Sequence, residues 1–231
     1  MNKILVFIAI ILAVILIIIK NTNIHEKSKF NSKMIKKILK KYKPSYFIYV
    51  KKKDYRLYIM DHIGRVVRSF DIAIGRKKDF ARKIYKNDNG TPEGLYRVKE
   101  ILSLAAGTNT YSYKRLKSMN TVYFKASEGH YLWGNPHKDA GQKAYGPRFF
   151  RLNYPNRQDI KDHHALVKKG RIPKNENGTF PGLGGGIGIH GTNDPPSIRH
   201  MISSGCIRML NSELVLLDDY LKVGSPVYIE K

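Results

Sequence analysis

Short runs of β-branched and aromatic residues, separated by turn residues, do most to constrain the fold of this chain. Lys-Lys-Lys-Asp at 51–54 and a dense cluster of Asn, Asp, Gly and Pro at 87–94 are typical of turns. Strands joined in this way predict a mainly β fold, a β-sandwich or a barrel-like sheet, with a few short helices. Asn211 is a good N-cap, and the residues after it predict a helix of about ten residues. The predicted strands span residues 46–50, 56–60, 65–74, 95–99, 121–124, 149–152 and 226–229.

The amino-terminal part of the sequence holds an apolar run at residues 4–19, followed by Lys20. A membrane-spanning helix needs about 20 apolar residues and a signal-peptide core about 7–15, so this run lies between the two. No small-residue cleavage site follows, which favours an uncleaved hydrophobic helix that anchors residues 1–20. Whether the segment is cleaved stays open. The lysines that follow oppose an extracytoplasmic domain by the positive-inside rule, but the chemistry of the motif described below favours one.

Residues 21–44 are rich in Lys, Ser and Asn and form a predicted basic linker. Within it, Met34, Ile35 and Ile38 have helical spacing among lysines. This pattern fits either an amphipathic helix on anionic lipid headgroups or a solvated tether. Residues 45–231 then form the main predicted domain.

The balance of charge is strongly basic, with 42 Lys and Arg against 18 Asp and Glu and a formal net charge of +24. A surface of this kind attracts anionic polymers or anionic membrane. The sequence carries no finger, basic zipper or RNA-recognition signature, so nucleic acid is not an expected partner. Other anionic polymers and the membrane remain as possible partners.

One stretch, residues 187–211, holds the residues best suited to catalysis. It contains the only cysteine, Cys206, and a histidine, His190, that follows a glycine-rich run. A thiol and an imidazole brought together by a loop are the minimum parts of a cysteine nucleophile site, in which the imidazole takes the thiol proton and later returns it to a leaving amine. A lone cysteine can also be a small buried hydrophobe, but the residues that flank Cys206 favour the nucleophile.

Four further histidines lie between the predicted strands and invite a metal interpretation. They lack the spacing of metal ligands and have no cysteine partner. The sequence therefore predicts neither a metal site nor an organic cofactor. These histidines are His130, His137, His163 and His164.

The motif His-Gly-Thr at 190–192, followed by Ser-Gly-Cys-Ile-Arg at 204–208, resembles the signature of the YkuD-type L,D-transpeptidase catalytic domain family. The likeness extends over roughly residues 46–230 and implies a YkuD-like mainly β fold. One position departs from the family pattern, because Ser204 stands where His is usual, which bears on substrate or acceptor preference. Weaker resemblances to the family lie at residues 73–75, 90–94, 145–149, 152–156 and 224–227.

The resemblance implies a role for each residue of the motif. Cys206 would be the nucleophile and His190 its base, and an imidazolium partner would lower the cysteine pKa from about 8.5 to below neutrality. Backbone N–H groups around Ser204, Gly205 and Cys206 would form an oxyanion hole, with Gly205 permitting the tight turn. Arg208 would either pair with a substrate carboxylate or support the loop.

Gly191 follows the predicted base directly and is a predicted substrate-binding residue, together with Ser204 and Arg208. Because Gly191 has no side chain, a backbone carbonyl would have to orient the imidazole of His190.

The implied reaction begins on a peptidoglycan stem tetrapeptide. The thiol would attack the carbonyl of the third residue, expel the terminal D-alanine and leave a thioester, and an amine from a neighbouring stem would resolve it into a 3→3 cross-link. This assigns the chain to peptidoglycan biosynthesis and cell shape, on the periplasmic or wall side of the membrane. The alternatives are an L,D-carboxypeptidase or amidase with the same Cys-His site, and a wall-binding domain without catalysis.

Overall fold

The computed structural model describes residues 30–231. The chain divides into two compact units, with the boundary between Lys43 and Pro44. The predicted membrane helix at 4–19 lies outside the described residues, so it stays a prediction. Among residues 30–231, no helix is both long enough and apolar enough to cross a membrane.

Helix α2 (Ser32–Tyr42) makes up most of the described part of the first unit. The side chain of Asn31 caps its start by accepting the N–H of Met34 at 3.0 Å. Lys40 and Lys41 lie in the last turn, where positive charge suits the carboxyl end of a helix. Residues 32–42 of the predicted linker are therefore helical, and whether this helix lies on lipid headgroups or forms part of a solvated tether stays open.

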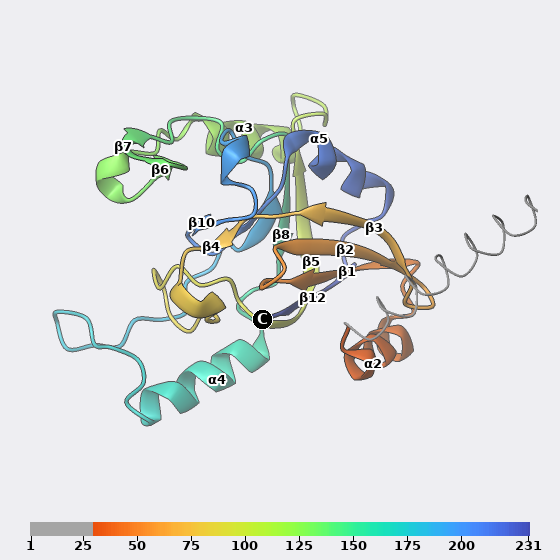
Figure 1. The fold of residues 1–231 in the computed structure, drawn as a ribbon, viewed down its shortest axis with the longest axis horizontal. Coiled ribbons are helices and arrows are strands. Elements are labelled where there is room, and N and C mark those ends of the chain that lie inside the picture. The colour runs from red at the N-terminus through yellow and green to blue at the C-terminus, as the bar shows by residue number, and fades with distance from the viewer. Residues whose placement is uncertain (1–29) are drawn as a thin grey trace, which may run out of the picture. The chain divides into compact units, whose positions relative to one another are not determined.

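The second unit is built on one curled eight-stranded sheet with the order β11-β9-β8-β5-β12-β1-β2-β3 (Figure 1). Most neighbours are antiparallel, but β1 pairs in parallel with β12, and β9 in parallel with β11. The sheet curls until Ala73, just after β3, bridges Arg208 in β11 at the opposite edge. The strands are β1 (Tyr46–Lys51), β2 (Arg56–Asp61), β3 (Val66–Asp71), β5 (Gly94–Ser103), β8 (Arg148–Leu152), β9 (Gly188–His190), β11 (Ile207–Arg208) and β12 (Pro226–Glu230).

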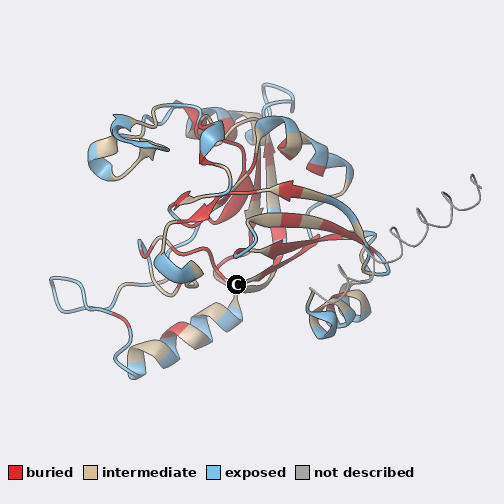
Figure 2. Ribbon diagram, viewed as in Figure 1, coloured by how far each residue is buried: buried red, intermediate tan, exposed pale blue. Residues whose placement is uncertain are grey.

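The hydrophobic core lies inside this curl, and β1, β2, β9 and β12 are buried at most of their positions (Figure 2). Strand β1 is buried at four consecutive positions, which explains its unbroken apolar and aromatic sequence. Residues from both halves of the chain meet in the core, including Ile48, Ile59, Tyr96, Phe150, Ile189 and Ile207.

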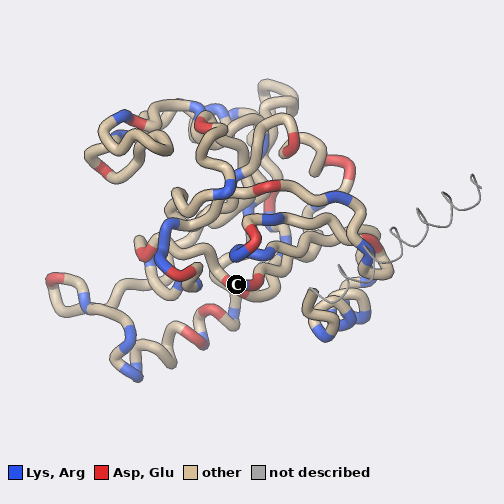
Figure 3. The backbone as a smooth tube through the Cα atoms, viewed as in Figure 1, with Lys and Arg blue, Asp and Glu red and all other residues tan. Residues whose placement is uncertain are grey.

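Smaller elements surround the sheet. Strand β4 pairs with β10, and β6 pairs with β7. Lys and Arg are spread over helices, strands and loops rather than gathered on one element (Figure 3). The bounds are β4 (Ile74–Gly75), β6 (Tyr131–Leu132), β7 (Asn135–Asp139), β10 (Met201–Ser203), α3 (Tyr111–Thr121), α4 (Arg157–Lys168), α5 (Asn211–Leu214), and the 3-10 turns η1 (Lys78–Phe80), η2 (Ala126–Glu128), η3 (Pro195–Ser197) and η4 (Val215–Asp219).

The mainly β fold predicted from the sequence is confirmed, and three of its local predictions are wrong. The predicted strand at 121–124 is absent, because Thr121 ends α3 and only Phe124 forms an isolated bridge. The run at 65–74 splits into β3 and β4, because the chain changes partners after Ile72: the N–H of Ala73 donates to the carbonyl of Arg208, and that of Ile74 to the carbonyl of His200. The predicted helix after Asn211 does form, as one turn of α-helix followed directly by η4, but the predicted N-cap is wrong because Asn211 is the first helical residue and Leu210 is the cap.

Candidate active site

The parallel pairing of β9 with β11 brings the predicted site residues together. Arg208 stands opposite His190, and Ile207 stands opposite Ile189. Because side chains alternate between the two faces of a strand, Cys206 and Arg208 share one face with His190. The thiol, the imidazole and the guanidinium therefore lie on the same side of the sheet.

His190 is held in a defined orientation. Only 3% of the residue is exposed. Its ring stacks on Phe149 with centroids 5.6 Å apart and lies 5.0 Å from the ring of Tyr145. Nδ1 lies 2.7 Å from the carbonyl oxygen of Gly191, the kind of backbone partner expected from the sequence. A proton on Nδ1 leaves Nε2 as the basic nitrogen of the neutral ring.

The electrostatic environment keeps His190 neutral. Burial lowers its pKa to about 3, and the charge of Arg208 acts in the same direction. The carbonyls of Gly191 and Ala144 oppose the shift without reversing it. At neutral pH the ring is a base without charge.

Cys206 is partly exposed, and its thiol donates to the carbonyl of Gly186 at 3.6 Å. Burial of the sulfur raises the pKa of the thiol, although the backbone N–H of Gly188 and the charges of Arg208 and Lys83 favour the thiolate. The resting site is therefore a neutral thiol beside a neutral imidazole. It is not the thiolate–imidazolium pair that the sequence predicted, because burial outweighs the favourable charges.

A neutral resting pair predicts a specific pH dependence. The rate of Cys206 alkylation by iodoacetamide should keep rising as the pH approaches and passes 9.0. Burial raises the pKa of the thiol above 9.0, so the sulfur stays protonated at lower pH. Loss of any His190-dependent activity in acid should occur well below pH 6.5, because a lowered pKa keeps the ring unprotonated. Mass spectrometry of the alkylated chain measures the first rate, and a plateau already reached at neutral pH would contradict the assignment.

Arg208 brings a hydrogen-bond donor with no partner to the site. Its Nε–H is buried and donates no hydrogen bond to any of residues 30–231. Burial lowers the pKa of the guanidinium, while the groups of Cys206, Asp194 and Tyr145 raise it. An unsatisfied buried donor costs about 1–3 kcal/mol. An incoming carboxylate or carbonyl group would remove that cost.

The turn that precedes the thiol has one constrained position. Gly205 has φ +129°, a conformation that side chains rarely adopt. Its N–H donates to the hydroxyl of Ser203 at 3.1 Å, so this N–H is not free for an oxyanion. No hydrogen bond to the N–H of Cys206 occurs within the described chain, which leaves that group as a candidate donor. Ser204 is exposed beside it.

Asn211 supports the loop after His190, a role that the sequence did not reveal. Its Oδ1 accepts the N–H of Thr192 at 2.9 Å instead of capping a helix. A Cβ atom on Gly191 would lie 2.0 Å from this oxygen, and one on Gly146 would lie 2.3 Å from it. Gly191 is thus required by packing, and its place in substrate binding stays a prediction.

An open cleft of about 650 Å³ lies beside this loop. That volume lies within the usual range of ligand sites, about 300–1,000 Å³. Residues from α3 and from both sides of the loop line it, among them Tyr113, Lys117, Asn120, Gln142, Lys143, Thr192 and Asn193.

Within residues 30–231, no metal site is formed by the four histidines that invited a metal interpretation, His130, His137, His163 and His164. Among residues 30–231, no group of three or more His, Cys, Asp or Glu side chains is placed to hold a metal ion. His163 instead binds the carbonyl of Ile84 through Nδ1 at 2.8 Å. His130 packs against Phe124 with ring centroids 4.9 Å apart.

A curled, mainly β sheet that presents a cysteine and a histidine on one face is the arrangement expected of the family that the sequence resembles. Residues 45–229 match the model of the YkuD L,D-transpeptidase catalytic domain, and the chain belongs to this family. The family was thus identified correctly from the sequence.

Two proteins of Bacillus subtilis (strain 168) share short similar segments with the chain. The putative L,D-transpeptidase YkuD is 46% identical over 44 residues, which are 19% of this chain and 27% of that protein. The putative L,D-transpeptidase YqjB is 50% identical over 42 residues, which are 18% of this chain and 24% of that protein. The chain thus matches only about a quarter of the length of either relative.

Solved structures show weaker similarity. Bd1075 of Bdellovibrio bacteriovorus is 21% identical, with 81% of this chain and 48% of that chain covered and a TM-score of 0.46. The helical cell shape determining protein Pgp2 of Campylobacter jejuni is 20% identical, with 81% and 48% covered and a TM-score of 0.44. The family assignment rests on the family model and not on these structures.

Proposed function

We propose that this chain is a peptidoglycan L,D-transpeptidase with Cys206 as its nucleophile and His190 as its general base. Family membership supports the enzyme class. The observation that carries the site is the placement of the partly exposed thiol, the buried neutral imidazole and Arg208 on one face of β9 and β11.

In the proposed acylation step, the sulfur of Cys206 attacks the carbonyl carbon of the third residue of a stem tetrapeptide while its proton passes to Nε2 of His190. The N–H of Cys206 stabilises the oxyanion. The C–N bond to D-alanine then breaks, and the leaving amine takes the proton back from His190. The product is a thioester on Cys206.

In the second step, an amine of a neighbouring stem attacks the thioester and restores the thiol, which leaves a 3→3 cross-link. Arg208 would pair with a carboxylate of the donor stem, a role favoured by its unpartnered Nε. Neither step needs a metal or an organic cofactor.

Incubation of the purified chain with tetrapeptide muropeptides tests this function. We expect release of D-alanine together with cross-linked dimers. Tripeptide without dimer would instead assign the chain to the carboxypeptidases, because water and amine compete for the same thioester. Absence of both products would remove the proposal.

We also propose that the chain acts on the periplasmic or wall side of the membrane, with residues 4–19 as anchor and residues 45–231 as the catalytic domain; membership of a family of L,D-transpeptidases supports this side of the membrane. Anionic wall polymers would be further partners of the basic surface. Amino-terminal sequencing of the membrane-bound protein tests the anchor, since a mature chain that begins after residue 20 would exclude it.

A further inference from the structure

Asp88 is a buried carboxylate outside the predicted motif, with a side chain only 1% exposed. Burial alone would raise its pKa, but hydrogen bonds from Lys77, Ile84 and Gly90 and the charge of Lys83 hold the pKa below its ordinary value. The carboxylate accepts from Lys77 Nζ at 2.8 Å, Lys83 Nζ at 3.2 Å, Ile84 N at 2.7 Å, Tyr85 N at 3.4 Å and Gly90 N at 3.0 Å.

These bonds fold residues 77–91, called here the Asp88 loop, around one charged centre. Asn87 and Asn89 on either side of Asp88 have positive φ angles of 66° and 56°, which asparagine tolerates better than most residues. The backbone of the loop packs tightly on itself, since a Cβ on Gly90 would lie 2.7 Å from the nitrogen of Lys83. Asp88 holds this position through the hydrogen bond that its Oδ1 accepts from the N–H of Gly90 at 3.0 Å.

The Asp88 loop touches the candidate site at the residue before the nucleophile. A Cβ on Gly205 would lie 2.8 Å from the carbonyl oxygen of Gly90, so the two backbones are in contact. The loop also holds the segment on the other side of the thiol, because the N–H of Lys86 donates to Gly182 at 2.7 Å. That segment continues to Gly186, whose carbonyl accepts a hydrogen bond from the thiol of Cys206.

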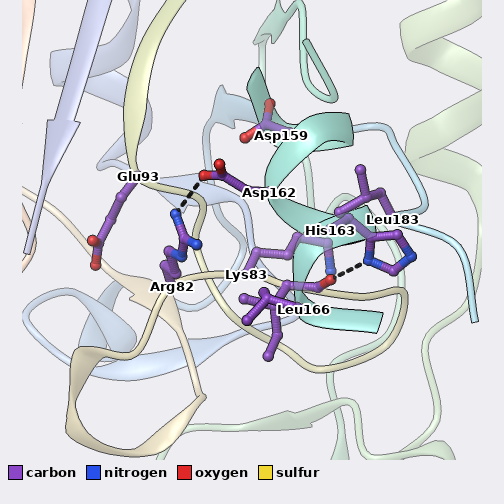
Figure 4. Close-up of a pocket in the computed structure, with 9 residues that line it drawn as sticks. Arg82, Lys83, Glu93, Asp159, Asp162, His163, Leu166 and Leu183 are labelled. Atoms are coloured by element: carbon purple, nitrogen blue, oxygen red, sulfur yellow. Dashed lines mark hydrogen bonds and ion pairs between the residues drawn. The ribbon is translucent and has the colours of Figure 1, made fainter. Parts of the chain in front are cut away.

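Helix α4 fixes the outer side of the same loop (Figure 4). Arg82 forms an ion pair with Asp162 at 2.9 Å, and His163 binds the carbonyl of Ile84. The space between loop and helix has a volume of about 10 Å³, roughly that of one water molecule. The ion pair and the hydrogen bond therefore hold the loop against the helix.

We propose that Asp88 is a positioning residue for the reaction, because it sets the Gly90 backbone against Gly205 and thereby fixes the turn that carries Cys206 and its N–H group. This inference rests on the proposed function for its effect on rate. If Asp88 only stabilised the fold, its replacement would lower the stability of the chain without moving the turn that carries Cys206.

Asp88→Asn tests the proposal, with Asp61→Asn as matched control. Asp61 is also a buried carboxylate that fixes a loop: it accepts the N–H groups of Ile63 and Arg65 and the Arg65 side chain. Its turn joins β2 to β3, at the edge of the sheet opposite β11. Both variants should lower Tm, but only Asp88→Asn should lower kcat on muropeptides, by about tenfold to a hundredfold with KM nearly unchanged.

Hydrogen exchange gives a readout that does not depend on substrate. Amides of residues 203–208 should exchange faster in Asp88→Asn than in the parent chain, and Asp61→Asn should leave them unchanged. Hydrogen exchange can be measured even when the parent chain has no muropeptide activity. Failure of the proposed function can therefore be told apart from failure of the positioning role. Unchanged exchange in a folded Asp88→Asn, or an equal loss of kcat in both variants, would overturn the proposal.

Where Asp88→Asn fails to fold, Lys77→Gln replaces it, since the Lys77 side chain is 22% exposed and its loss leaves the backbone bonds of Asp88 in place. We expect a smaller fall in kcat and faster exchange at residues 203–208. Parent-like values of both in Lys77→Gln would overturn the proposal.

Discussion

Alanine in place of Cys206 should abolish turnover of stem tetrapeptides, with kcat reduced by roughly 10⁴-fold or more. The side chain that attacks the carbonyl is then absent, and an isolated His190 base has no thiol from which to take a proton. D-alanine release measures the loss, and mass spectrometry should detect no acyl adduct on the variant.

The stability of this variant separates a catalytic effect from a structural one. Cys206 packs only at the margin of a small cluster formed by Leu102, Leu116 and Phe149. Loss of one sulfur there should change Tm little compared with truncation of a core leucine, which costs about 2–5 kcal/mol. Cys206→Ser, which keeps the shape of the side chain, should be equally inactive because its hydroxyl is a far weaker acid. Retained activity in either variant would remove the nucleophile assignment and the proposed function with it.

The β part of the fold could be predicted because its signals are local. Strands β1 and β2 are apolar and aromatic runs joined by one polar turn, and their register follows from that turn. Helices α3 and α4, which were not predicted from the sequence, lack such a simple pattern. A readable signal did precede α4, where Asn156 and Asp159 form a capping box.

The errors elsewhere have a tertiary cause. Asn211 fits the rule for a helix cap, but its side chain instead fills the space left by Gly146 and Gly191. Sequence distance hides that contact, because the three residues come from three separate segments. The interpretation of 121–124 as a strand failed for the converse reason, since its residues have strand propensity but find only one bridging partner, at Gly141.

The candidate site, like the fold, could be predicted only where its signal is local in the sequence. The motif identified His190 and Cys206 from residue types alone, and strand pairing then explains how they share a face. Their protonation states could not be predicted, because they depend on burial against Phe149 and Tyr145 from a distant segment. Asp88 was missed because its neighbours in sequence resemble an ordinary turn. Only the folded chain shows that this turn contacts the nucleophile's own turn.

Alanine in place of Gly205 should lower kcat by about 10²–10³-fold, the cost of losing one oxyanion-hole donor. Two effects of the substitution together displace the N–H of Cys206, the candidate oxyanion donor. The φ of +129° is unfavourable for a side chain, and the added Cβ would lie 2.8 Å from the carbonyl oxygen of Gly90. Because a backbone carbonyl cannot rotate away as a flexible side chain can, the turn itself must move, and it carries both the sulfur and the N–H of Cys206.

Gly224→Ala is the matched control for this variant. Gly224 also has a positive φ, +96°, but an added Cβ there would meet no atom within 4 Å. Backbone strain of about 1–3 kcal/mol should lower Tm in both variants, whereas the fall in kcat should be confined to Gly205→Ala. Steady-state release of D-alanine and thermal unfolding measure the two quantities. If Gly205→Ala kept its kcat, close contact with Gly90 would not control the geometry of attack, and the positioning role of Asp88 would lose its physical link to the thiol.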